Sequence, residues 1–100
     1  MSGLDQMLRL QKWTLDEKRR QATDLEALIE RLRGDIRRLD DEVGNEVEAA
    51  RNDLELSRVL PDYKRMMAER RARIEKSVAD LTQELEKLIE VLAIVGLRRH

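Results

Sequence analysis

Apolar residues recur along the chain at alternating spacings of three and four, which is the heptad pattern of a coiled coil. Two series are present, and each keeps its phase over many turns at heptad positions a and d. The first series consists of Leu4, Leu8, Leu15, Ala22, Leu25, Ile29, Leu32, Ile36, Leu39, Val43 and Ala50. The second consists of Leu60, Met67, Ile74, Val78, Leu81, Leu85, Leu88, Leu92 and Val95. This pattern predicts two long amphipathic helices.

The segment "RNDLELSRVLPDYK" interrupts the pattern between the two series. Asn52 and Asp53 are poor helix formers, and Pro61 suits the first turn of a new helix. The whole chain, 1–100, is therefore expected to form a single domain. Its expected elements are helix one at about 3–51, a turn at about 52–60 and helix two at about 61–95.

A long helix with one apolar seam is not stable alone in water and needs a partner. If the chain folds back at the break, each a residue of one helix meets a d residue of the other, as an antiparallel pair requires. The resulting layers include Leu15 with Val95, Ala22 with Leu88, Ile29 with Leu81 and Val43 with Met67. We therefore predict an all-α fold, a two-helix antiparallel coiled-coil hairpin.

The same register makes two further predictions about the seam. The acidic seam residue Glu46 falls opposite the basic seam residue Lys64, so these two are expected to form a polar pair. Leu4 and Leu8 have no partner within the chain, so the first two turns of helix one are expected to project beyond helix two.

A second set of apolar residues lies away from the seam, close to both chain ends. Trp13, one of only two aromatic residues, occupies the outward position f. Because the two ends of an antiparallel hairpin are neighbours, these residues are expected to share one tip and to bind a partner protein. Scattered apolar residues on a surface are common, and that remains the simpler alternative. The expected interaction residues, to which the basic Arg20 is added, are Met7, Leu10, Trp13, Arg20, Ile94 and Leu97.

Composition excludes several classes of function. Charged residues make up 41% of the chain and the net charge is −1, with acidic and basic residues interleaved, so nucleic-acid binding is not favoured. No apolar run is long enough to insert into a membrane, and a cytoplasmic location is expected. Cysteine is absent, the single histidine is His100, and no catalytic or metal-binding motif is present. We expect neither an enzyme nor a cofactor.

The opening run "LDQMLRLQKWTLDEKRR" (4–20), the Tyr after the break and the run "RMMAERRARIEKSVADL" are similar to the FliJ family of flagellar type III export proteins, in particular α-proteobacterial members. The resemblance covers roughly residues 4–88. It implies an antiparallel coiled-coil stalk that binds the hexameric export ATPase and links it to the membrane export gate. It also implies a place in the cytoplasm beside the flagellar basal body at the inner membrane, and a part in handling export chaperones.

Two alternatives to the stalk remain open. The protein could be an escort that binds export substrates or their chaperones through its apolar tip. It could also be a structural coiled coil that self-associates, for example as a homodimer.

Overall fold

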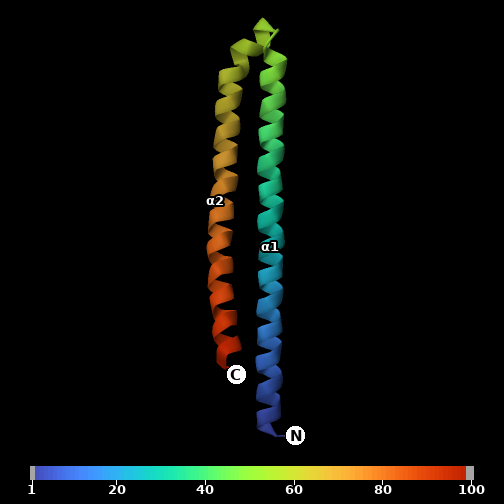
Figure 1. Cartoon of the computed structure of the whole chain (residues 1–100), viewed down its shortest axis with the longest axis vertical. Coiled ribbons are helices and arrows are strands. Elements are labelled where there is room, and N and C mark those ends of the chain that lie inside the picture. The colour runs from blue at the N-terminus through green and yellow to red at the C-terminus, as the bar shows by residue number, and fades with distance from the viewer. Residues whose placement is uncertain (1, 99–100) are drawn as a thin grey trace.

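The computed structural model of the chain describes the backbone of residues 2–98 and the side chains of residues 2–96. It contains two helices, α1 (Gly3–Ala50) and α2 (Leu54–Arg98), which run antiparallel and pack along their length (Figure 1). The molecule measures 78 × 18 × 18 Å. The predicted all-α hairpin is therefore confirmed, and its shape is that of a narrow rod.

The start of α1 is capped by a side chain. Ser2 has an extended backbone, with φ −82° and ψ 157°, and its Oγ accepts a hydrogen bond of 3.3 Å from the Asp5 backbone N–H. This bond satisfies one of the donors that a helix leaves free in its first turn. Near the other end of α1, the Arg51 N–H donates to the Glu48 carbonyl at 3.3 Å, so the helix tightens as it ends.

The connection between the helices is shorter than predicted. Residues 51–53 form the turn, and α2 begins at Leu54, well before position 61. Asp53, which the sequence pattern marks as a breaker, is the N-cap of α2: its Oδ1 accepts a hydrogen bond of 3.1 Å from Leu56 N–H. Its carbonyl accepts the first helical bond, 3.0 Å long, from Ser57 N–H. The predicted turn at 52–60 is therefore wrong, because Asp53 starts a helix there.

Pro61 consequently lies inside α2 and not in its first turn. A proline has no N–H, so the carbonyl four residues earlier, that of Ser57, loses its helical donor. Pro61 is exposed, which leaves this part of the helix surface open to water. The helix continues through this position as far as Arg98, slightly past the predicted end near 95.

The seam between the helices is the core of the protein. From Leu15 to Ala50 every a or d residue of α1 is buried or half-buried except Glu46, and from Leu60 to Val95 the same holds for α2 except Lys64. The two predicted heptad series are thus confirmed over this length. Two helices cannot enclose a large side chain completely, and none among the described residues is fully enclosed. The residues with the least exposure are Leu15, Ala22, Ile29, Leu39, Ala50 and Met67.

Contacts across the middle of the seam show the register. Val43 and Met67, predicted to pair, line one groove together with Lys64. Glu46 and Lys64 both carry exposed side chains, and among residues 2–98 they do not form an ion pair. Water screens charges at such positions, so their attraction is weak. Glu46 and Lys64 therefore do not form an ion pair. Their position opposite each other in the seam stays a prediction.

Candidate protein interface at the open end of the hairpin

The start of α1 and the end of α2 lie at the same end of the rod, here called the open end, and α1 projects beyond α2 there (Figure 1). Leu15 is the first buried residue of α1, with 4% of its surface exposed. The preceding seam residues Leu8 and Leu4 are 64% and 71% exposed. The apolar seam therefore continues for two turns past the point at which α2 covers it.

Beside this uncovered seam, α1 carries a second row of exposed apolar side chains. Trp13 is 64% exposed, and Leu10 and Met7 are exposed to a similar extent. Residues spaced by three and four lie on adjacent turns of one helix face. The spacing of Met7, Leu10 and Trp13 thus makes a continuous apolar row along the outside of the first turns.

α2 adds apolar side chains at the same end of the rod. Ile89, Val91 and Ile94 are all exposed. Leu97 belongs to the helical part of α2, but its side chain lies outside the described residues. Val91 occupies heptad position g and Ile94 position c, the same positions as Met7 and Leu10 on α1.

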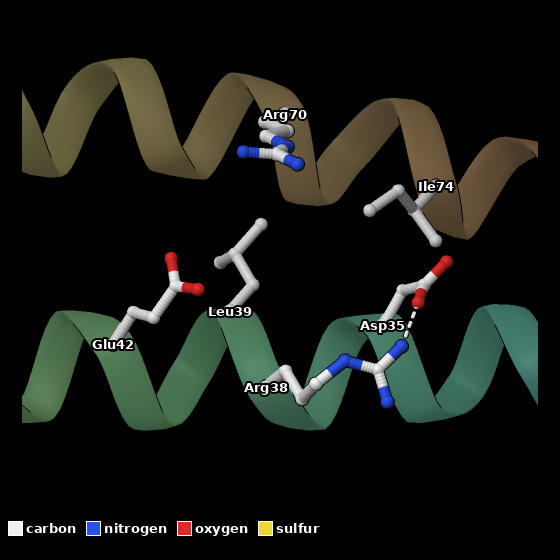
Figure 2. A pocket seen from close by; sticks show the side chains of 6 residues that line it. All are labelled: Asp35, Arg38, Leu39, Glu42, Arg70 and Ile74. Carbon is white, nitrogen blue, oxygen red and sulfur yellow. Dashed lines mark hydrogen bonds and ion pairs between the residues drawn. The ribbon is translucent and has the colours of Figure 1, made fainter.

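Positions g of the two helices flank the same side of the hairpin, here called the g face. Figure 2 shows this in the middle of the rod, where Asp35 and Glu42 of α1 and Arg70 of α2 line one groove with the seam residues Leu39 and Ile74 between them. The groove there is charged. The open end differs, because Met7 and Leu10 on α1 and Val91 and Ile94 on α2 place apolar side chains at g and c positions.

Basic residues follow the apolar row along α1. Arg20, expected to take part in binding, forms an ion pair with Glu17, and Arg19 lies 3.6 Å from Asp16. Both pairs lie within one helix and only Glu17 is half-buried, so each contributes only a few tenths of a kcal/mol. Arg20 therefore stays available at the surface, beyond the turn of Trp13.

The open end presents apolar side chains to solvent. Within the described residues, no three side chains of the metal-binding types gather into a site. Neither α1 nor α2 contains an apolar stretch that could cross a bilayer. What the open end can do is bury leucine, methionine and tryptophan side chains against another protein surface.

A second exposed apolar row escaped the sequence reasoning. On α2, near the turn that joins the helices, Leu56, Val59, Tyr63 and Met66 occupy successive g and c positions. Val59 and Met66 are 59% and 57% exposed, Leu56 is exposed and Tyr63 is half-buried. The signal was their own spacing of three, four and three. It was missed because Leu56 and Val59 were assigned to the turn at 52–60, which separated them from Tyr63 and Met66 in helix two.

Comparison of the chain with protein-family models, curated proteins and solved structures finds no match. The resemblance of residues 4–88 to the flagellar export family therefore stays a prediction.

Proposed function

We propose that this protein is a coiled-coil coupling stalk of the flagellar type III export apparatus. In this proposal its open end binds the hexameric export ATPase, and the rod links the ATPase to the membrane export gate. The protein would act in the cytoplasm beside the flagellar basal body at the inner membrane. In this role the protein binds its two partners and holds them at a fixed separation, and it catalyses no reaction.

The shape of the molecule supports this role. A rod 78 Å long and 18 Å wide holds its two ends at a set separation, as a linker between two partners must. The two-stranded seam provides the stiffness, because bending would break the packing of its a and d layers.

The observation that carries the proposal is the exposure of Trp13 within an apolar tip. Exposure of Trp13, Leu10 and Met7 to water is unfavourable in free energy. Tryptophan is also enriched among the interface residues that contribute most to binding energy. The sequence run that contains these residues is also the one most similar to the export family. Both points indicate that this end is the ATPase-binding end.

The test uses the export ATPase and the full-length protein. We expect the protein to raise the ATPase rate, and Trp13→Ala to weaken binding by about 2 kcal/mol or more. Because Trp13 is exposed, this variant should keep its helicity and melting temperature. Leu15→Ala is the matched control for the fold: it removes a buried residue and should cost about 2–4 kcal/mol of stability.

Trp13 fluorescence gives a second readout, because Trp13 is the only tryptophan. Its emission should be typical of an exposed indole in the free protein and shift to the blue when the ATPase is added. A blue shift with export chaperones and none with the ATPase would favour the escort alternative. A concentration-dependent blue shift of the protein alone would favour self-association.

A further inference from the structure

The rod has a second exposed apolar surface at the opposite end from Trp13. Leu56, Val59, Tyr63 and Met66, here called the turn-end row, extend for roughly 15 Å along the g face of α2. Arg70, at the next g position, closes the row toward the charged middle of the rod (Figure 2). The row contains Tyr63, the second of the two aromatic residues, so each end of the molecule presents one aromatic side chain.

Acidic residues border this row on the side of α1. Partial burial, together with the carboxylates of Glu46 and Glu42, raises the pKa of Tyr63, because nearby negative charge disfavours the phenolate. The packing of the seam agrees: Val43 of α1 and Lys64 of α2 line one groove, so Glu42 and Glu46 lie near the level of Tyr63. Both are exposed, so a molecule that covers the turn-end row would meet them at its edge.

Acidic residues also border the row on the outer side of α2. Glu55, Asp62 and Glu69 occupy successive f positions next to it. Asp62 is paired with Arg65 at 2.8 Å, whereas among residues 2–98 Glu55 and Glu69 form no ion pair. The turn-end row is thus an apolar strip with carboxylates at both edges, accompanied by the exposed Lys64 on the seam side and by Arg65, the partner of Asp62, on the outer side.

A second copy of the chain fits this strip poorly. In a two-fold arrangement Leu56 would pack on Met66 of the other copy and Val59 on its Tyr63, which suits the apolar residues. The same arrangement sets Glu55 against Glu69 of the other copy and Asp62 against its own equivalent. Like charges that face each other across an interface oppose association, so pairing of the turn-end rows of two copies is disfavoured.

We propose that the turn-end row binds an amphipathic helix of a partner protein whose apolar face is bordered by lysine and arginine. The apolar side chains of such a helix, spaced by three and four, would pack between Leu56, Val59 and Met66. Its basic residues would lie against Glu42 and Glu46 on one edge and Glu55 and Glu69 on the other. This site is independent of the ATPase-binding role proposed for the open end.

The probe is a synthetic helical peptide of about 18 residues, roughly five turns, with leucine on one face and lysine elsewhere. We expect fluorescence anisotropy of the labelled peptide to detect binding to the full-length protein. Val59→Ser combined with Met66→Ser should raise the Kd at least about tenfold, because the substitutions remove apolar contacts and change no charge. Circular dichroism should show an unchanged helical fold, since both residues are exposed.

Two pairs of substitutions test where the peptide binds and whether charge contributes to its binding. Val91→Ser with Ile94→Ser makes the same kind of change at g and c positions of the open end and should leave the peptide Kd unchanged. Glu42→Gln with Glu69→Gln should raise the Kd several-fold and reduce its dependence on salt, because fewer charges are matched. The same peptide with glutamate in place of lysine should not bind.

Three results would overturn the proposal. One is equal binding of the lysine peptide to the Val59→Ser, Met66→Ser variant. Another is equal binding of the lysine and glutamate peptides. The third is a doubled mass by light scattering that returns to the single-chain mass in the same variant, which would make a second copy the occupant. None of these results bears on Trp13 and the ATPase.

Discussion

Arg71 is a charged residue at an a position of the seam, between apolar layers. Its Nε donates a hydrogen bond of 2.9 Å to Asp40 Oδ1, and its Nη2 donates one of 3.1 Å to Asp40 Oδ2 across the two helices. It also pairs with Glu75 on its own helix. The aliphatic part of Arg71 lines the groove with Leu39 and Met67 while its guanidinium reaches the carboxylates at the edge. A bidentate pair of this kind matches one residue of α1 to one of α2 and so favours the observed register.

This pair predicts a specific pH dependence. The hydrogen bond from Arg71 lowers the pKa of Asp40 below its ordinary value of 3.8, because it favours the charged carboxylate. A lowered pKa in the folded state stabilises the fold above the ordinary value, and this contribution is lost as the pH falls below about 4 through the lowered value. Asp40→Asn should therefore reduce stability at neutral pH and remove this part of the acid dependence.

Thermal melts between pH 2 and pH 7, a range that spans the ordinary aspartate pKa of 3.8, check the prediction. Asp41→Asn is the matched control, since it removes a neighbouring carboxylate that does not contact Arg71. If both variants kept the pH profile of the unchanged protein, the Asp40–Arg71 pair would contribute nothing to it.

At the scale of the element, the beginning of α2 depends on one side chain. Asp53 accepts a hydrogen bond from Leu56 N–H through its carboxylate, which satisfies a donor that the first turn leaves free, and its carbonyl accepts the first helical bond from Ser57 N–H. The Ser57 hydroxyl donates to the Leu54 carbonyl at 2.9 Å within the same turn. These bonds let the helix begin before Pro61, and the early start creates the turn-end row by making Leu56 and Val59 helical.

The cap can be tested by substitution. Asp53→Ala should destabilise the hairpin by about 1 kcal/mol, the usual cost of losing an N-cap. Asp62→Ala serves as the control, because it removes an exposed aspartate from α2 whose ion pair with Arg65 is worth little. Urea unfolding followed by circular dichroism measures both. Equal losses of stability in the two variants would mean that Asp53 has no special role.

At the scale of the whole molecule, the hairpin is a rod with two chemically different ends. The open end presents Trp13, Leu10 and the uncovered seam residue Leu8, with basic residues following along α1. The turn end presents the apolar turn-end row between carboxylates. Ends that differ in charge would select different partners, which is what a linker between two components requires.

The single-chain hairpin itself can be tested by crosslinking, because the protein contains no cysteine of its own. Leu25→Cys with Leu85→Cys places thiols at predicted partner positions, and both leucines are half-buried. Oxidation should join them within one chain. Leu25→Cys with Met67→Cys is the mismatched control, displaced by about 27 Å along the axis. A dominant crosslink between chains in the matched pair would indicate an intermolecular coiled coil.

The periodicity of the sequence by itself determined the two helices, their seam and the outward position of Trp13. In each helix the apolar residues, such as Leu15 and Ile29 in α1 and Met67 in α2, recur every three to four positions. Because a helix turns 100° per residue, this spacing alone places the apolar residues of a helix on one face. The hairpin also follows from the sequence, because a against d pairing holds along one antiparallel register. Trp13 lies outside that repeat and is accordingly exposed.

Only the tertiary structure decided features that depend on both helices at once. Asp53 has the same low helix propensity whether it ends a helix or caps one, and the choice depends on whether the residues after it pack on α1. The partner of Arg71 could not be read from its own helix, since Asp40 reaches it only in the folded register. The carboxylates of Glu42 and Glu46 beside Tyr63 belong to α1, so this acidic edge of the turn-end row exists only after the two helices pack.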